Sequence, residues 1–251
     1  MIPVYYDLHI HTALSPCADD DMTPNDIVGM AVLNGLDVIA VTDHNSLANA
    51  RAVIKAAETM HAAAATDAQA RPGQNLLVLP GVEVMTAEEV HVLCLFSDFE
   101  AAYGFETTLI PYFSPLTNRV DIFGKQLLYD ENDRITGEME RMLIAATTVS
   151  FDELYFMTQR YDGAFIPAHV DRDSFSVISN LGFLPPHLKI NTVEVSPGGI
   201  EAGYDRENSG LFPNCRMIFS SDAHQLWAIN EKKHSLMLPE RSSKAIIDYL
   251  R

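Results

Sequence analysis

Six of the nine histidines in this sequence lie at the ends of apolar runs. They are His9, His11, His44, His91, His169 and His224. In the first run, VYYDLHIH (4–11), strand alternation would turn His9 and His11 to the same face. Imidazole groups combined with Asp and Glu oxygens suit zinc, manganese or iron. The pattern therefore predicts a metal centre.

Two carboxylates fall at the same kind of position. Glu83 lies near the end of the run LLVLPGVEV (76–84), and Asp222 ends the run MIFSSD (217–222). A hairpin return of HVLCLF (91–96) would place His91 beside Glu83. Such a density of buried ionisable groups is costly unless cations bind, and more than one cation is needed to use them all. Glu83 could bridge two ions, and a water on them would become a hydroxide nucleophile near neutral pH.

Strand-like runs alternate with helical segments, which predicts an α/β fold with a largely parallel sheet. The expected strands are 4–11, 36–42, 76–84, 91–96, 164–169, 192–196 and 217–222. Thr23 followed by Pro24 predicts a helix start, and Ser46 can cap a second helix, which the loop at 66–75 ends. A capping box of Ser150 and Glu153 predicts a later helix, and 242–250 reads as a closing one. Barrels of this type carry their active sites at the C-terminal ends of the strands.

The chain length of 251 residues favours one domain. Residues from about 100 to 163 break the strand–helix rhythm with an acidic, turn-rich stretch at 129–138, and we expect them to form an insertion over the barrel mouth. Neither a signal peptide nor a run of about 20 apolar residues is evident, so we expect a cytoplasmic protein with no membrane partner.

Charge and cysteine content limit the partners. The three cysteines lack CxxC spacing and are expected to be reduced thiols. A formal net charge of −17 has the wrong sign for tracking a phosphate backbone, so we expect no extended duplex nucleic acid. A small phosphorylated substrate is still admissible because bound cations would offset the charge locally. The oligomeric state is left open.

The segments DLHIHT, VTDHN, GVEV, HVL, PAH and SSDAH resemble, in order and over nearly the whole chain, the polymerase and histidinol phosphatase (PHP) domain family. They are most similar to its stand-alone phosphoesterases, related to nucleotide phosphatases and short-RNA exonucleases. The resemblance implies a distorted (β/α)7 barrel with a small insertion between the fourth and fifth strand-like runs. It also implies a centre of two or three divalent metal ions, of Zn, Mn or Fe.

The family pattern implies three sets of metal ligands. One ion would be held by His9, His11, Glu83 and Asp222, a second by Glu83, His91 and His169, and a third by His44, His224 and a residue after HIHT. At that last position the sequence departs from the family, because Ser15 is followed by the longer segment PCADDD. Counting back from Pro24 nominates Asp19, whereas Asp20 or Cys17 could substitute.

The expected catalytic residues are Glu83, Asp222 and Arg172. By the same resemblance, Arg172 would bind the substrate phosphate, although a surface ion pair is an equal alternative. Asp7, Asp43 and Asp222 are candidates for the leaving-group acid, and the sequence does not choose among them. Asp7 could instead orient a ligating imidazole.

Four further polar side chains are not expected in the site. Alternation in TVEVS could bring Glu194 to the cavity, but we interpret it as a carboxylate at the edge of the core. We do not expect His61, His187 or His234 to be ligands.

The function expected from the sequence is hydrolysis of a small phosphomonoester or short nucleotide by a metal-activated hydroxide. Two alternatives remain open at this point. The chain could be a catalytically weak binding or regulatory module that keeps its metal. It could also be an amidohydrolase-like enzyme, since an activated hydroxide can attack a carbonyl centre.

Overall fold

The computed structural model describes residues 1–66 and 75–251, so most of the loop expected at 66–75 lies outside the described residues. The strands are β1 (Ile2–Ile10), β2 (Val38–Val41), β3 (Leu77–Met85), β4 (His91–Leu95), β5 (Leu127–Tyr129), β6 (Ile135–Glu138), β7 (Ala164–Pro167), β8 (Thr192–Glu194), β9 (Arg216–Ile218) and β10 (Ser235–Leu238). The α-helices are α1 (Pro24–Leu33), α2 (Ala50–Thr66), α3 (Phe99–Leu109), α4 (Val120–Phe123), α5 (Phe151–Arg160), α6 (Val177–Leu181), α7 (Pro197–Ala202), α8 (Tyr204–Glu207) and α9 (Ser243–Leu250). Single 3-10 turns occur at η1 (Ile110–Tyr112), η2 (Ser209–Leu211) and η3 (Leu226–Ala228).

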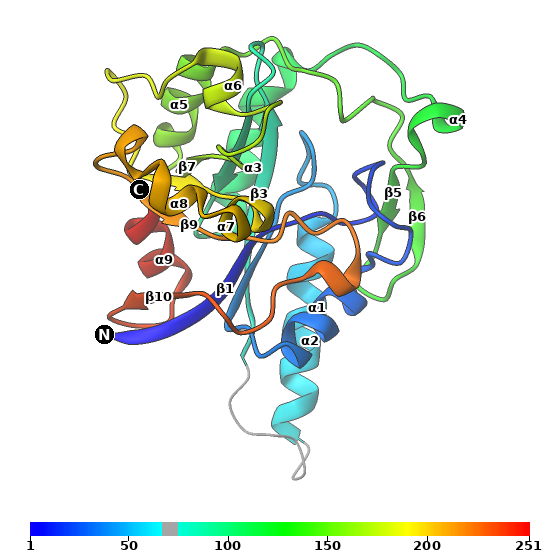
Figure 1. Cartoon of the computed structure of the whole chain (residues 1–251). Helices are drawn as coiled ribbons and strands as arrows, with labels where there is room; N and C mark the ends of the chain where they lie inside the picture. The colour runs from blue at the N-terminus through cyan, green and yellow to red at the C-terminus, as the bar shows by residue number, and fades with distance from the viewer. Residues whose placement is uncertain (67–74) are drawn as a thin grey trace.

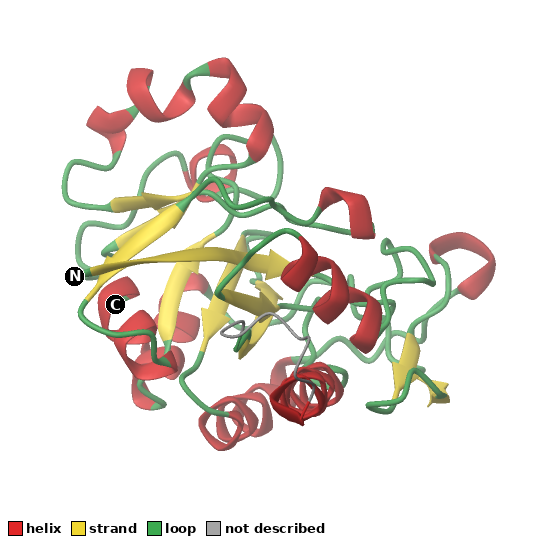
Figure 2. Ribbon diagram, turned by 90° about the horizontal axis from the view of Figure 1, so that it is seen from below, coloured by secondary structure: helices red, strands yellow, loops and turns green. Residues whose placement is uncertain are grey.

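The main sheet has the strand order β10-β1-β2-β3-β4-β7, and β8 pairs with β9 in a second, two-stranded sheet (Figure 1). Strands β1, β2 and β3 are parallel, whereas β4 runs antiparallel to both β3 and β7. A bridge from Ile10 to Ala223 links the end of β1 to the segment after β9. The expected α/β class is confirmed, in the form of a curled half-barrel sheet with helices around it (Figure 2). The expectation of a largely parallel sheet is wrong, because three of the five strand pairs in the described main sheet are antiparallel.

The hairpin of β3 and β4 determines where two site residues lie. Its register pairs Met85 with His91, so the start of β4 lies beside the end of β3. On β3, Val82 and Val84 are fully buried in the core, and alternation turns Glu83 to the opposite face of the strand. The predicted hairpin is therefore confirmed, and it brings Glu83 and His91 to one end of the sheet.

Several helix boundaries follow the predicted capping residues. The Thr23 side chain accepts a hydrogen bond from the Asp26 backbone N–H at the start of α1. The capping box of Ser150 and Glu153 opens α5, as predicted. The predicted cap at Ser46 is wrong, because α2 begins only at Ala50. The Ser46 hydroxyl instead accepts from the Ala48 N–H within the preceding turn.

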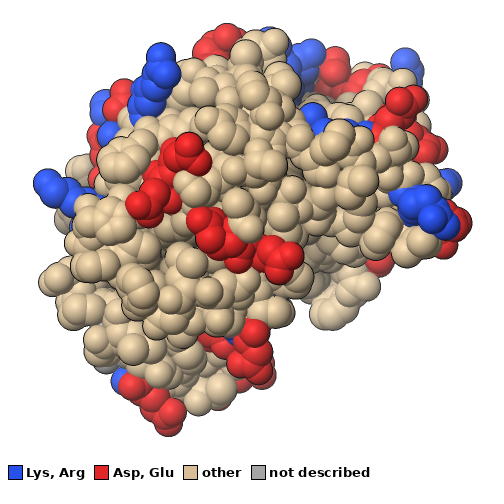
Figure 3. All heavy atoms as spheres, turned by 90° about the horizontal axis from the view of Figure 1, so that it is seen from above, with Lys and Arg blue, Asp and Glu red and all other residues tan. Residues whose placement is uncertain are grey.

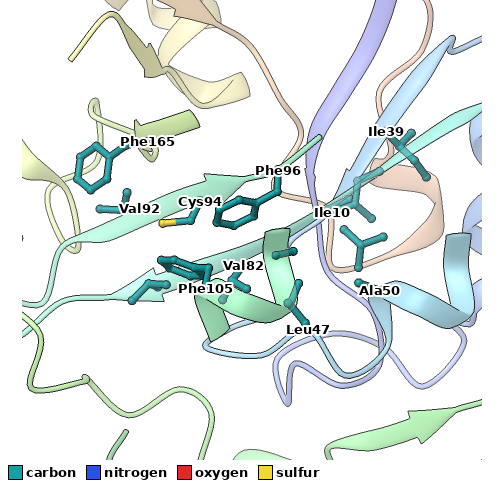
Figure 4. Close-up of a cluster of buried hydrophobic side chains, with 14 of the residues drawn as sticks. Ile10, Ile39, Leu47, Ala50, Val82, Val92, Cys94, Phe96, Phe105 and Phe165 are labelled. Carbon is teal, nitrogen blue, oxygen red and sulfur yellow. The ribbon is translucent and has the colours of Figure 1, made fainter. Parts of the chain in front are cut away.

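Between the sheet and its helices lies an apolar core that fixes the strands (Figure 4). Phe96 and Phe105 are fully buried, with ring centroids 4.9 Å apart. Gly163 is required beside them, because a Cβ there would lie 2.5 Å from Cε1 of Phe96. This packing holds β3, β4 and the adjoining α3 in fixed positions, and with them the strand ends that carry the site.

The segment expected as an insertion, about 100–163, has two kinds of structure. Its terminal helices, α3 and α5, pack against β3 and β7 respectively. Between them, α4 and the β5–β6 hairpin lie away from the main sheet, at the right of Figure 1. The hairpin is attached to the N-terminal part of the chain, where the Leu127 N–H donates to the Ala13 carbonyl at 2.8 Å. None of the helices in the described part of the chain has the length and apolar character needed to cross a bilayer.

Candidate metal centre

Imidazoles and carboxylates from β1, β3, β4 and the loops after β2, β7 and β9 meet at one end of the sheet. Among the described residues, three groups each have ligating atoms that lie within 4.8 Å of one another. They are His9, His11 and Glu83; His44, Glu83 and His91; and His11, His44 and His224. Every group shares a member with another, so the three form one continuous cluster.

Glu83 lies at the centre of this cluster and is 1% exposed. Its Oε1 is 2.8 Å from Nδ1 of His91, and its Oε2 is 2.8 Å from Nδ1 of His44. Oε1 is also 3.4 Å from Nε2 of both His9 and His169. Burial opposes ionisation of this carboxyl, but the surrounding imidazoles outweigh burial and hold its pKa well below the usual range. Glu83 is thus an anion that contacts several of the histidines predicted to bind metal.

Asp222 approaches the same atoms from the other side. Its Oδ1 is 3.1 Å from Nε2 of His11 and 3.2 Å from Nε2 of His9. Both Asp222 and His169 have left-handed backbone conformations, with φ values of 53° and 31°. Such conformations are costly for residues other than glycine and concentrate at functional sites. The chain tolerates this strain where it delivers two of the predicted ligands.

In three of the imidazoles, Nδ1 is engaged by an acceptor that is not a predicted ligating atom. Nδ1 of His9 lies 2.9 Å from Glu194 Oε2, and Nδ1 of His11 lies 2.9 Å from Ser15 Oγ. Nδ1 of His224 lies 2.8 Å from the Asp222 carbonyl oxygen. An Nδ1–H donated to each acceptor leaves the Nε2 lone pair free, which is how outer partners orient metal-ligating histidines.

Glu194 is a site residue that the sequence interpretation missed. It is 1% exposed, and its Oε2 accepts from the His169 backbone N–H at 3.2 Å as well as from His9. The interpretation as a core-edge carboxylate is therefore wrong. Alternation in TVEVS turns Glu194 away from the fully buried Val193 and Val195, and that was the available signal.

Asp7 and Asp43, two candidates for the leaving-group acid, are held in structural hydrogen bonds. Asp7 accepts from the backbone N–H groups of Ser221 and Asn230, both at 2.9 Å, and so positions the segment that carries Asp222. Asp43 accepts from the Ser15 hydroxyl at 2.8 Å, which in turn fixes His11. Burial raises the pKa of each carboxyl to about 6.

Of the residues considered for the third ligand set, the structure brings Cys17 into contact with the histidines. Burial would raise the pKa of its thiol, but hydrogen bonds with His224 and His44 lower that pKa to about 7. Cys17, Asp19 and Asp20 are all exposed, and none of them belongs to a ligand group among the described residues. The Asp19 backbone N–H donates to the His224 carbonyl at 2.9 Å, which ties this loop to the segment after β9. The choice among Asp19, Asp20 and Cys17 therefore stays a prediction, and Cys17 is the one that lies beside His44 and His224.

Arg172 lies at the edge of the cluster with its side chain 43% exposed. One guanidinium nitrogen is 2.7 Å from Asp222 Oδ2. The remaining donors of its planar fork can bind an anion next to the cluster. The three histidines that were set aside lie elsewhere: His61 is exposed on α2, His187 pairs with Asp152, and His234 packs against Phe219.

The donor set fits divalent metal ions. Nε2 of His91 and both ring nitrogens of His169 are buried without a hydrogen-bond partner among the described residues, which is costly for polar atoms unless they bind a cation. Two donors about 2.1 Å from one ion at a tetrahedral angle would be about 3.4 Å apart. The separations of 3.1 to 3.4 Å among His9, His11, Glu83 and Asp222 fall close to this value.

A half-barrel with histidines and carboxylates gathered at one rim defines the class of metal-dependent hydrolases that includes phosphoesterases and nucleases. Within that class, the chain belongs to the PHP domain family, whose model matches residues 7–177. In sequence it is 35% identical over 98 residues to the 5′-3′ exoribonuclease Rnm of Escherichia coli (strain K12), which is 38% of this chain and 28% of that protein.

Solved structures share the fold at low sequence identity. The lesion-specific endonuclease EndoQ from Pyrococcus furiosus matches 99% of this chain and 56% of its own, with a TM-score of 0.66 and 17% identity. A protein from Bifidobacterium adolescentis described as a metal-dependent phosphoesterase matches 99% of this chain and 96% of its own, with a TM-score of 0.54 and 15% identity. The chain thus spans about half the length of EndoQ and less of the exoribonuclease.

The expectation of no extended duplex nucleic acid requires correction. Endonuclease Q has also been solved with a 27-mer duplex substrate, in a structure that matches 99% of this chain and 56% of its own with a TM-score of 0.61 and 16% identity. The relative in sequence is an exoribonuclease. Net charge was a poor guide because it averages the whole surface, whereas bound cations reverse the local sign at a site. Figure 3 shows one face with acidic side chains near its middle and most basic ones towards its edges.

Proposed function

We propose that this chain is a metal-dependent phosphoesterase that hydrolyses a phosphoester bond of a nucleotide or of a nucleic-acid strand. The observation that carries the proposal is the environment of Glu83. This buried carboxylate contacts imidazoles from β1, from β4 and from the loops that follow β2 and β7. A shared anion of this kind suits a bridging ligand between two metal ions. The names of the exoribonuclease and of Endonuclease Q support a phosphoester substrate.

The proposal assigns the ligands as three overlapping sets around two or three ions of Zn, Mn or Fe. His9, His11, Glu83 and Asp222 form the first set. Glu83, His91 and His169 form the second. His44, His224 and Cys17 form the third, with sulfur in place of a carboxylate. When bound, such ions acidify a water that serves as the nucleophile and neutralise negative charge on the phosphate.

The residues of this chain then have separable tasks. Glu194 and Ser15 keep the His9 and His11 rings in one orientation through their Nδ1 atoms. Arg172 would donate to a phosphate oxygen from the guanidinium N–H groups that do not pair with Asp222. Asp222 orients Arg172 and therefore links the phosphate position to the ligand cluster.

Access to the cluster limits the shape of the substrate. Glu83, His9 and His169 are at most 1% exposed, so a phosphate within an intact, stacked strand cannot reach them. The reacting phosphate would belong to a strand end, a free nucleotide or a nucleotide extruded from a duplex. We further propose that residues 1–251 form one domain in which the segment of about 100–163 borders this entrance.

The proposal is tested with metal-loaded protein and a panel of phosphoesters. The panel contains p-nitrophenyl phosphate, nucleoside monophosphates and short 5′-phosphorylated RNA and DNA strands. We expect hydrolysis of at least one nucleotide substrate with Mn²⁺ or Zn²⁺, and a loss of about 10³-fold or more in Glu83→Gln. The exposed Glu201→Gln serves as a matched control. A folded, metal-loaded protein that leaves the whole panel intact would overturn the proposal.

A further inference from the structure

Phe175 is an aromatic residue at the edge of the ligand cluster that has no part in the proposed hydrolysis. Phe175 lies between His169 and α6 in the sequence. Its large apolar side chain is 41% exposed. Its ring is stacked on that of His91, with centroids 5.0 Å apart and an interplanar angle of 24°. One face of the phenyl ring thus covers a predicted metal ligand, and the exposed fraction faces solvent.

The position of this ring is fixed by the backbone. Phe175 has a φ of 57°, a left-handed conformation that is unfavourable for a bulky residue. Its carbonyl accepts from the His91 N–H at 2.9 Å, which ties the loop to the first residue of β4. On the other side, the Ser176 hydroxyl donates to the Arg172 carbonyl at 2.8 Å. The chain therefore maintains a strained conformation that presents an aromatic ring at the rim.

Other exposed aromatic residues differ from Phe175 in their surroundings. Trp227, Phe156 and Tyr103 are more than half exposed. Within the described ranges 1–66 and 75–251, Phe175 is the exposed aromatic residue whose ring stacks on a histidine of the cluster. Single exposed apolar residues are common, but a strained backbone that holds an aromatic ring against a candidate site is typical of functional positions. The position thus suggests a ligand that has a flat apolar face and enters the metal site.

We propose that Phe175 stacks on the nucleobase of the substrate and makes the site selective for phosphoesters that carry a base. This inference rests on the proposed function, and it names the part of the substrate that the function leaves open. His169, Arg172 and Phe175 lie on one short segment, so a single loop would place the phosphate and the base together. Every base has an aromatic face, so this contact would tolerate different base sequences.

Steady-state kinetics separate the base from the phosphate. Wild type, Phe175→Ala, Phe175→Leu and Phe175→Trp are compared on a nucleoside monophosphate or short RNA and on p-nitrophenyl phosphate. Loss of base stacking should raise KM for the nucleotide by about 5- to 150-fold, with a much smaller change for the base-free ester. Leucine keeps apolar bulk against His91 and should still show the loss, whereas tryptophan should retain binding. Phe156→Ala, an exposed aromatic on α5, should behave as wild type.

A binding measurement distinguishes failure of this inference from failure of the proposed function. A nucleotide containing 2-aminopurine is titrated into each metal-loaded variant, because stacking on an aromatic ring quenches its fluorescence. We expect quenching by wild type and Phe175→Trp, and little by Phe175→Leu. Equal KM increases for both substrates, or equal quenching by wild type and Phe175→Leu, would overturn the inference. Inactivity on every phosphoester with retained quenching would overturn the proposed function but not the stacking.

Discussion

Replacement of Glu194 should weaken metal binding without disturbing the fold. Its Oε2 holds two donors, Nδ1 of His9 at 2.9 Å and the His169 backbone N–H at 3.2 Å, while its Oε1 is buried without a partner among the described residues. In Glu194→Gln, the amide oxygen can take the place of Oε2 and keep both contacts as weaker, neutral hydrogen bonds. In Glu194→Ala both donors lose their acceptor, and the His9 ring is free to turn.

These contacts give a graded expectation. Loss of an outer partner of a ligating histidine reduces metal affinity by about 10- to 100-fold, or about 1.4 to 2.8 kcal/mol. Because Gln keeps the geometry and loses only the charge, we expect Glu194→Gln to reduce the metal affinity by an amount near the lower end of this range. Glu194→Ala should reduce it by an amount near the upper end. Affinity is measured by competition with a fluorescent zinc chelator, with metal content determined in parallel. Circular dichroism of the metal-free proteins checks folding.

The exposed Glu201→Gln is the control, because it makes the same chemical change on α7 without touching a histidine of the cluster. It should bind metal as wild type does. If folded Glu194→Ala bound zinc within twofold of wild type, the argument that Glu194 orients His9 would be refuted.

Three further outcomes follow from the geometry. In metal-free protein near pH 7.5, Cys17 should react rapidly with a thiol reagent, since its pKa is about 7 while that of buried Cys94 is about 12; a fast phase that survives in Cys17→Ser would contradict this. Chelation of the metals should lower the melting temperature, and an unchanged temperature would contradict metal binding to the native state. Gly163→Ala should lower the free energy of unfolding by about 1 to 3 kcal/mol through overpacking against Phe96. An unchanged free energy of unfolding in urea denaturation would contradict the tight packing.

Local patterns in the sequence were sufficient for the strands that carry most of the cluster. Alternation in β1 places His9 and His11 on one face, and the short connection between β3 and β4 predicts the hairpin that brings His91 to Glu83. These inferences depend on contacts between near neighbours or on strand ends that share one rim. They required no knowledge of how distant loops are shaped.

The parts that sequence reasoning missed depend on long-range geometry. Glu194 is 185 positions from His9, and strand alternation alone does not say which face of a short strand meets the site. The choice among Cys17, Asp19 and Asp20 depends on the path of the PCADDD loop, which spacing in the sequence does not determine. The short strands β5, β6 and β10 contain only three or four residues each, too few for a periodic signal.

Anomalous X-ray scattering from crystals of the metal-loaded protein tests the central claim most directly. Data collected on both sides of the zinc or manganese absorption edge locate each ion without reference to activity. We expect at least two peaks, one between His9, His11 and Asp222 and one beside His91 and His169, with Glu83 in contact with both. Loaded crystals that show no peak within coordination distance of Glu83 would contradict the account.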